Sequence, residues 1–307
     1  MILSSERFIP HTYENLVKSK VFPSPIPEDF YNRMCNDYAQ VSDIITNRIV
    51  YESDGLKVTG ISAFPLKTQE KTHPIMIYNR GGNREFGKLT VLPVMRTLVP
   101  FASAGYLLYA SNYRGNDGGE GVEEFGGADV NDVLNLIEIA KENPAWDGKN
   151  IFMQGHSRGG MMTYLCLRRN KAITAAISIA GVSDLVQSGI TRPEIEKYVH
   201  GELIKVPENE REQAYKKRSA VCWAEEMDTP LLLLHGDNDD RVDVSHSINI
   251  AKKLEEFGKE HELVIYAGGN HALLRHWDEV TGKSISWFEG HRLSIPSPLQ
   301  GDGKGAI

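Results

Sequence analysis

The feature that most constrains this chain is the pentapeptide GHSRG at residues 155–159, which stands between a short apolar run and a segment rich in helix formers. This order is typical of a nucleophile elbow, in which a serine on a strained strand-to-helix turn raises its hydroxyl above the end of the strand. The flanking glycines lack the Cβ atoms that would collide in such a turn, and the following helix directs free backbone N–H groups at the same point. We therefore expect Ser157 to be a nucleophile if partners follow downstream, because a bare G-x-S-x-G also arises by chance in a chain with 28 glycines.

The rest of the chain alternates between strand-like and helix-like segments. Two β-rich runs at residues 44–53 and 56–65 flank Asp54-Gly55, a strong hairpin signal. Apolar runs typical of buried strands alternate with helical stripes and lie at residues 74–78, 106–111, 151–153, 175–180, 230–234 and 262–266. This alternation favours right-handed crossovers and a sheet covered on both faces. With the elbow, it predicts an α/β-hydrolase fold: a mostly parallel twisted sheet of about eight strands, with helices on both faces and a small helical cap insertion.

The same patterns divide the chain into parts. Residues 1–43 are irregular in pattern and are expected to form an N-terminal arm with two short helices. Residues 44–295 are expected to form the α/β-hydrolase domain, in which the charged, helix-leaning stretch 183–228 is a cap insertion. Residues 296–307 are of low complexity and are expected to form a flexible C-terminal tail.

Composition and charge argue against several classes of protein. A net charge of −7 and a pI near 5.8 provide no basic footprint for nucleic acid. No apolar run is long enough to span a membrane and the first residues lack the layout of a secretory signal, so we expect no membrane partner and a cytoplasmic location. Three cysteines without C-x-x-C spacing, and the lack of H-x-H or H-E-x-x-H spacing, predict neither a disulfide framework nor a metal site. We expect no metal and no organic cofactor, and the choice between monomer and homo-oligomer stays open.

A serine hydroxyl needs a base, and a histidine oriented by a carboxylate is the usual solution. In the α/β-hydrolase order, serine, acid and histidine follow one another along the chain, each at the carboxyl end of a strand. Among the ten histidines, His271 lies in a glycine-rich loop directly after a late strand, and we expect it to be the base. His261 precedes that strand, and His246 and His276 fall in helical segments. His156 and His235 are interpreted as local structural residues.

The acid is expected in the loop after the strand at residues 230–234. Spacing alone does not choose among the four aspartates of this loop, which are Asp237, Asp239, Asp240 and Asp243. Asp184, after the preceding strand, is an outside alternative, because a carboxylate on a neighbouring strand end could reach the same imidazole.

A double glycine follows the strand at residues 74–78, in the segment NRGGN. Such a loop brings bare backbone N–H groups close to whatever binds at the strand end. In enzymes with a nucleophile elbow it supplies one half of the oxyanion hole, and the residue after the nucleophile supplies the other. The two donors are therefore expected to be Gly82, with Gly81 or Asn83 as neighbouring candidates, and Arg158. An ordinary Gly-Gly turn is the alternative.

Three segments together resemble the catalytic domain of the prolyl oligopeptidase family within the α/β-hydrolase superfamily. NYRGNDGGEG is similar to that family's NYRGSxGYG segment, GHSRGGMMTY to its nucleophile elbow, and HGDNDDRVDVSHS to its HGxxDxRVPxxxS acid loop. The resemblance covers about residues 58–288. It implies Ser157 as nucleophile, Asp239 as acid and His271 as base, and it implies Gly82, in an RGGN segment where relatives have HGGP, as an oxyanion donor beside Arg158.

The resemblance implies a serine hydrolase that cleaves an acyl bond through a Ser-His-Asp triad and an acyl-enzyme, acting as a peptidase on short peptides. A carboxylesterase acting on small esters is the alternative. Family members that act on peptides usually carry a β-propeller before this domain, and some use a tyrosine in the oxyanion hole. Here about 43 residues precede the expected sheet, and no tyrosine follows Gly82 closely. The expected partner is a small-molecule or short-peptide substrate, for whose carboxylate or carbonyl Arg80 and Arg241 are candidate ligands, with structural ion pairs as the alternative.

Overall fold

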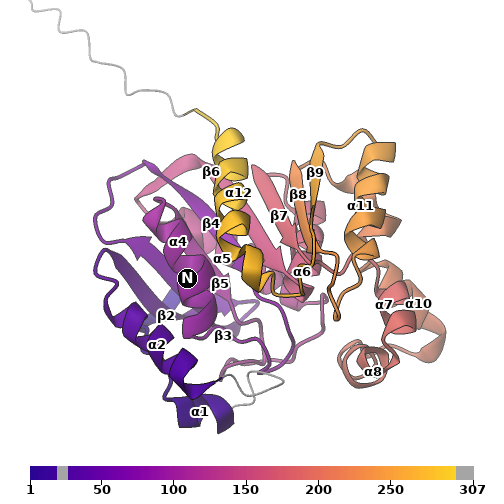
Figure 1. Ribbon diagram of the computed structural model, residues 1–307, viewed down its shortest axis with the longest axis horizontal. Coiled ribbons are helices and arrows are strands. Elements are labelled where there is room, and N and C mark those ends of the chain that lie inside the picture. The colour runs from indigo at the N-terminus through magenta and orange to yellow at the C-terminus, as the bar shows by residue number, and fades with distance from the viewer. Residues whose placement is uncertain (19–26, 295–307) are drawn as a thin grey trace, which may run out of the picture.

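The computed structural model describes residues 1–18 and 27–294. Its centre is one nine-stranded sheet with the strand order β1-β2-β3-β5-β4-β6-β7-β8-β9 (Figure 1). The pairs β1–β2, β2–β3 and β3–β5 are antiparallel, and the pairs that follow in this order, from β5–β4 to β8–β9, are parallel. The strands are β1 (Ile2–Arg7), β2 (Ile44–Ser53), β3 (Leu56–Pro65), β4 (His73–Asn79), β5 (Leu107–Ser111), β6 (Trp146–His156), β7 (Ala175–Ile179), β8 (Leu231–Gly236) and β9 (His261–Tyr266). The predicted mostly parallel sheet is confirmed, with nine strands in place of about eight.

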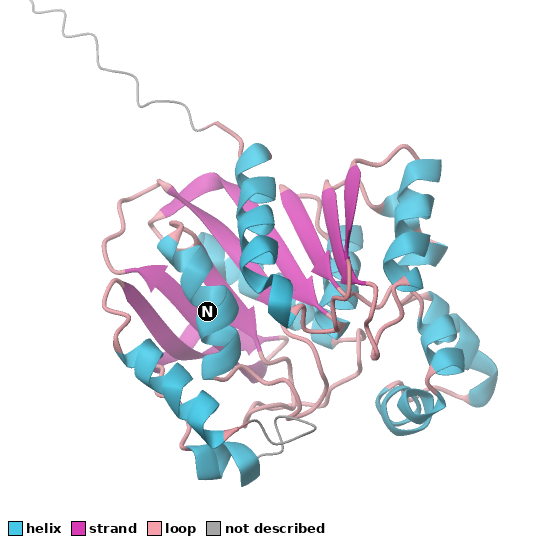
Figure 2. Ribbon diagram, in the orientation of Figure 1, coloured by secondary structure: helices cyan, strands magenta, loops and turns pink. Residues whose placement is uncertain are grey.

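Helices cover both faces of this sheet (Figures 1 and 2). Helices α5, α6 and α11 contribute to the core on one face, and α4 and α12 contribute to the core on the other. The α-helices are α1 (Tyr13–Lys18), α2 (Glu28–Ala39), α3 (Val91–Pro93), α4 (Val99–Ser103), α5 (Asp129–Lys141), α6 (Arg158–Arg169), α7 (Leu185–Thr191), α8 (Pro193–Ile195), α9 (Gly201–Leu203), α10 (Arg211–Lys216), α11 (Ser245–Glu256) and α12 (Trp277–Gly290). A π-helical turn, η1 (Val94–Leu98), links α3 to α4.

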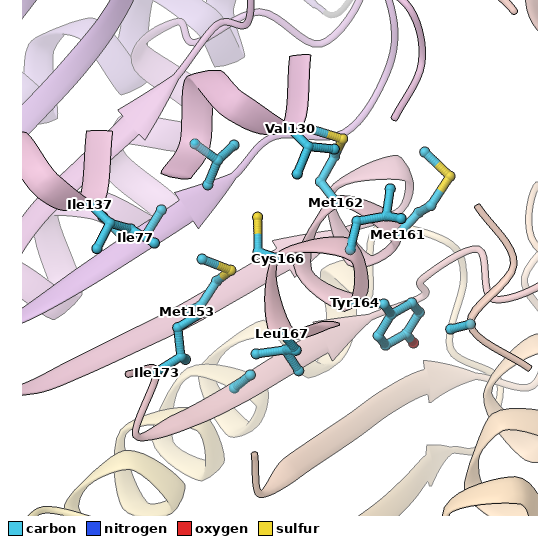
Figure 3. Close-up of a cluster of buried hydrophobic side chains, with 14 of the residues drawn as sticks. Ile77, Val130, Ile137, Met153, Met161, Met162, Tyr164, Cys166, Leu167 and Ile173 are labelled. Carbon is cyan, nitrogen blue, oxygen red and sulfur yellow. The ribbon is translucent and has the colours of Figure 1, made fainter. Parts of the chain in front are cut away.

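Side-chain alternation along the central strands builds the two cores. In β4, Ile75 and Ile77 point into the core beside α5 and α6, whereas Met76 and Tyr78 point into the core beside α4 and α12. All four are buried, since a parallel strand with helices on both sides has no solvent face. Figure 3 shows the first core around α6, where Met162 lies beside Val130 of α5 and Cys166 lies nearer to Met153 of β6. This packing anchors the helix that begins directly after Ser157.

The N-terminal segment joins the sheet earlier than the sequence suggested. Residues 1–43 were expected to precede the sheet as an arm, but β1 pairs antiparallel with β2 at the sheet edge. Every residue of β1 is exposed, so the strand carries no alternation of buried and exposed positions that could have revealed it. The rest of the segment forms α1 and α2, near the two helices that were expected, and Tyr31 of α2 is buried.

The stretch 183–228 is helical, as expected for a cap. It contains α7 to α10 together with a π-helical turn, η2 (Glu196–His200), and three 3₁₀ turns, η3 (Glu208–Glu210), η4 (Ala220–Cys222) and η5 (Ala224–Glu226). Its contacts with the loops at the carboxyl ends of the strands include two that arginines make. The Arg84 guanidinium lies 2.5 Å from the Glu202 carboxylate, and Arg192 donates to the Arg241 carbonyl at 3.0 Å.

Two further expectations concerned the C-terminal tail and membrane-spanning segments. The predicted flexible tail, residues 296–307, lies outside the described residues. Across residues 1–18 and 27–294, none of the helices combines the length and the apolar character that a bilayer crossing demands.

The ring cluster under α12 gives a direct test of the core. Phe288 is fully buried and stacks on Phe152 of β6 with ring centroids 4.6 Å apart. We expect Phe288→Ala to lower the free energy of unfolding by about 3–5 kcal/mol, because it removes a large side chain from a closed site. Phe257→Ala is the matched control, since that ring is 45% exposed and its loss is expected to change stability by about 0.5 kcal/mol or less. Urea unfolding measures both, and equal losses would contradict this account of the core.

Candidate active site

The chain turns sharply at Ser157, between β6 and α6. Its backbone has φ 59° and ψ −123°, a conformation that costs free energy for a residue with a Cβ. The turn is held because the Ser157 N–H donates to the Ile179 carbonyl at 2.8 Å. A Cβ on Gly155 would lie 2.0 Å from the Gly159 carbonyl oxygen, and one on Gly159 would lie 2.0 Å from that of Asn79. Glycine is therefore required on both sides of the serine, as the elbow pattern predicts.

The acid loop after β8 surrounds the Asp239 carboxylate with donors. Its Oδ1 accepts the backbone N–H groups of Arg241 at 2.8 Å and Val242 at 3.0 Å. Its Oδ2 lies 2.8 Å from Nδ1 of His271 and 3.1 Å from Nε2 of His235. Burial alone would raise the pKa of Asp239, but the hydrogen bonds from the two histidines hold it well below its usual range. The group is thus a buried carboxylate that is charged at neutral pH.

Three of the other candidate acids have local structural contacts. Asp237 accepts the Gly268 N–H at 2.6 Å, and Asp243 accepts the Ser245 N–H at 2.9 Å. Asp184 caps α7 by accepting two N–H groups of its first turn. Among the described residues, Asp239 alone of the five candidate aspartates hydrogen-bonds to His271.

His235 is a neighbour of the site that sequence reasoning treated only as a local structural residue. Its Nε2 lies 2.8 Å from the Val242 carbonyl as well as 3.1 Å from Asp239. A carbonyl only accepts, so Nε2 carries the proton and Nδ1 accepts from the Ser247 hydroxyl at 2.7 Å. His235 therefore gives the acid a second imidazole donor. The signal that could have revealed this role was the four-residue spacing between a histidine at a strand end and the aspartate in the loop that follows.

His156 connects the elbow to the loop that carries His271. Its Nε2 donates to the His271 carbonyl at 2.8 Å, and the two imidazole rings lie 4.8 Å apart between centroids. Burial, helped by the adjacent His271, lowers the pKa of His156 to about 3. The ring is therefore uncharged at neutral pH and acts as a hydrogen-bonding tie. The sequence places it beside Ser157 but gives no sign of this partner 115 positions away.

The glycine-rich loop after β4 lies against the elbow. A Cβ on Gly81 would come within 3.2 Å of the Ser157 Cβ, and Gly82 has φ 73°, which favours glycine. Within the described part of the chain, no hydrogen bond occupies the Gly82 N–H. Arg158 is the first residue of α6, where backbone N–H groups lack partners inside the helix. The structure thus brings both predicted oxyanion donors to the edge that carries the serine.

The two arginines proposed as substrate ligands differ in their surroundings. Arg80 is 1% exposed, and all five of its N–H groups donate to the backbone carbonyls of Gly81, Arg84, Phe86 and Asn112. No donor remains for a substrate, so the structure contradicts a substrate-binding role for Arg80 and assigns it to holding the loop.

Arg241 remains a candidate substrate ligand. Its guanidinium lies 5.9 Å from the centre of the Phe86 ring, and within the described chain its side chain has no hydrogen bond or ion pair.

A hydroxyl, an imidazole and a carboxylate therefore gather at one sheet edge. The Ser157 hydroxyl donates no hydrogen bond among the described residues, so a hydrogen bond from Ser157 to the His271 imidazole stays a prediction. Such contacts are often loose without a substrate and tighten when it binds. No group of three His, Cys, Asp or Glu side chains in residues 1–18 and 27–294 is placed to hold a metal ion.

Comparisons with known proteins point to one family. The model of the prolyl oligopeptidase family (Peptidase_S9) matches residues 94–291. An uncharacterized peptidase of Bacillus subtilis, YtmA, is 31% identical over 228 residues, which is 73% of this chain and 84% of that protein. A second uncharacterized B. subtilis peptidase, YuxL, is 28% identical over 78% of this chain but only 38% of its own length.

A solved structure shares the fold. The uncomplexed acylaminoacyl peptidase of Pyrococcus horikoshii superimposes with a TM-score of 0.71 at 25% identity, over 85% of this chain and 43% of that one. The present chain therefore spans less than half the length of that peptidase and of YuxL.

The buried histidines predict how stability depends on pH. His156 has a folded-state pKa of about 3 and His246 of about 4, both below the value near 6.5 of an unfolded chain. The unfolded state therefore binds more protons between these values, and the free energy of unfolding should fall as the pH decreases below about 6.5. We expect His156→Gln to flatten this fall by up to about 1.4 kcal/mol per pH unit near pH 5.

Urea unfolding at a series of pH values between 7 and 4.5 measures this slope. His246→Gln should flatten it independently, and the double variant should be flatter than either. An unchanged slope in His156→Gln would show that this ring titrates alike in both states.

Proposed function

Because the chain belongs to the prolyl oligopeptidase family, we propose that it cleaves short peptides as a serine peptidase through Ser157, His271 and Asp239. The family and the α/β-hydrolase fold predicted from the three sequence segments are confirmed by the family match and by the solved relative. The observation that most supports the proposed triad is the 2.8 Å hydrogen bond between Asp239 and His271, in a loop that His156 ties to the elbow.

The proposed chemistry follows from the positions of these groups. The Asp239 carboxylate accepts a hydrogen bond from the Nδ1–H of His271, which leaves Nε2 as the basic nitrogen. That nitrogen takes the Ser157 proton as the hydroxyl oxygen attacks the substrate carbonyl. The N–H groups of Gly82 and Arg158 then donate to the tetrahedral oxyanion. His271 returns the proton to the leaving amine, and a water molecule activated by the same imidazole releases the acyl group from Ser157.

The carboxylesterase alternative is not favoured. The similar proteins named above are peptidases, and one of them is an acylaminoacyl peptidase. An amide needs its leaving nitrogen protonated, and a histidine tightly held by a buried carboxylate suits that step. A catalytic site of this type also hydrolyses activated esters, so the distinction lies in relative rates.

Arg241 is the proposed substrate ligand. Its guanidinium has no hydrogen-bonding partner among the described side chains, and it comes from the loop that carries Asp239. A peptide carbonyl or a terminal carboxylate is the natural partner for such a group. A short peptide as the substrate is itself proposed, because the chain spans less than half the length of two of the relatives named above.

The nucleophile can be identified by covalent labelling. We expect a fluorophosphonate probe to modify the wild-type protein on Ser157 and to leave Ser157→Ala unlabelled, because only an activated serine reacts at a useful rate. Tryptic mapping by mass spectrometry locates the adduct. Ser4→Ala, in the exposed strand β1, is a matched control that should label fully. An adduct that persists in Ser157→Ala would refute the assignment.

The substrate class can be tested by paired kinetics. Peptide p-nitroanilides of two or three residues and p-nitrophenyl esters of short acids are compared at pH 7.5 by kcat/KM. We expect Asp239→Asn to lower kcat on the anilides by roughly 10⁴-fold, because the wrong imidazole tautomer is then favoured. Appreciable ester turnover with no detectable anilide turnover in the wild type would favour the carboxylesterase.

A further inference from the structure

A buried cluster of charges lies directly behind the proposed oxyanion hole. The Arg158 guanidinium donates from one terminal nitrogen to Glu123 and from the other to Asp129, and all three side chains are at most 4% exposed. The rings of Tyr113 and Phe125 each lie 4.7 Å from the guanidinium carbon. Buried ion pairs are weak contributors to stability, because the loss of hydration offsets most of their attraction. Such a cluster therefore suggests a task other than stability.

The cluster grips the glycine-rich loop at two points. The same Arg158 nitrogen that meets Glu123 also donates to the Gly82 carbonyl at 3.1 Å. The second oxygen of Glu123 accepts the Arg84 N–H at 2.7 Å. It also accepts from the Asn116 side chain at 2.9 Å, which fixes the orientation of the carboxylate. One ion pair therefore holds the loop on both sides of residue 83.

The loop needs such ties. Gly82 has φ 73° and Arg84 has φ 50°, so two residues of one turn occupy the left-handed region, which is costly for arginine. A conformation of this kind persists only where the surroundings impose it.

We propose that Glu123 and Arg158 form a clamp that sets the position of the Gly82 N–H relative to the Arg158 N–H, the two proposed oxyanion donors. Glu123 is then a positioning residue: it touches no substrate and acts through the loop and through Arg158. This inference rests on the proposed serine-peptidase function and adds the device that gives the oxyanion hole its geometry.

The charge state of Glu123 suits this task. Burial alone would raise its pKa, but the charges of Arg158 and Arg80 and the Arg84 N–H hold the pKa of Glu123 below its usual value. The carboxylate thus stays charged at neutral pH and keeps both of its contacts. A neutral amide at this position would keep the shape but lose the attraction to the guanidinium.

The test compares Glu123→Gln with Asp132→Asn. Asp132 is also a fully buried carboxylate, paired with Arg114, and among the described residues it has no hydrogen bond or ion pair with the glycine-rich loop. We expect both substitutions to lower Tm. We expect only Glu123→Gln to lower kcat on a peptide p-nitroanilide, by about 10- to 100-fold, because small misplacement of an oxyanion donor carries a cost of that size. KM should change by less than about threefold, since the oxyanion forms only in the transition state.

A second measurement separates positioning from general loosening. A peptidyl trifluoromethyl ketone forms a tetrahedral oxyanion adduct, and its inhibition constant should rise in Glu123→Gln by the same factor by which kcat/KM falls. In Asp132→Asn that constant should stay within about twofold of the wild type. Arg158→Lys serves if Glu123→Gln does not fold. A lysine keeps the charge but lacks the planar fork that reaches both carboxylates and the Gly82 carbonyl, so kcat should again fall with KM little changed.

The outcomes distinguish the clamp from the proposed function. A wild-type protein that neither labels with fluorophosphonate nor cleaves the anilide would overturn the proposed function itself. A wild type that is active, with Glu123→Gln and Asp132→Asn losing kcat equally or not at all, would overturn the clamp alone. Parallel losses in kcat/KM and in ketone affinity, confined to Glu123→Gln or Arg158→Lys, would support it.

Discussion

The close contact of backbones at the elbow is the constraint on which the rest of the site depends. Helix α6 begins so near β6 and β4 that a single methyl group on Gly155 or Gly159 would lie 2.0 Å from a carbonyl oxygen. The helix is fixed there by the buried side chains along its length. Because neither strand nor helix can move apart, the turn between them forces Ser157 to a positive φ and out of the sheet edge. The packing of the core thus supplies the free energy that holds the strained serine.

Sequence patterns revealed the parts of this protein whose structure demands particular residue types along a short stretch of chain. The parallel strands were predictable because burial on both faces demands short apolar runs, and the elbow because its glycines have no substitute. Strand β1 was missed because all six of its residues are exposed and it has no buried face to mark it. The choice of Asp239 among its neighbours came from a family resemblance and not from spacing. The structure supplies the reason that spacing could not. Asp237 and Asp243 accept backbone N–H groups of nearby turns, and among the described residues only Asp239 of the candidate aspartates hydrogen-bonds to His271.

The arginines show most clearly what a sequence leaves open. Arg80 and Arg241 were equivalent as candidates, because a cation near a strand end can face either substrate or protein. Arg80 is surrounded by backbone carbonyls that satisfy all five of its donors, whereas the Arg241 side chain lies near the Phe86 ring and has no hydrogen bond or ion pair among the described residues. Of the Arg80 partners only Asn112 comes from another loop, whereas Gly81, Arg84 and Phe86 belong to the loop that begins at Arg80. The difference therefore depends on the folded shape of this loop, which the sequence does not show. For Arg158, the local sequence pattern indicated only a role for the backbone N–H, and the buried side chain adds a structural role that no motif encodes.

The environment of Asp239 dictates which nitrogen of His271 can act as a base. Both carboxylate oxygens accept two donors, Oδ1 from the backbone and Oδ2 from two imidazoles. A carboxylate saturated in this way cannot rotate to follow a moving partner, so His271 must present an N–H at Nδ1 in one direction. The His156 bond to the His271 carbonyl restrains the same residue from the backbone side. With Nδ1 protonated and the loop restrained, the lone pair lies on Nε2, which is the arrangement that abstraction of a serine proton requires.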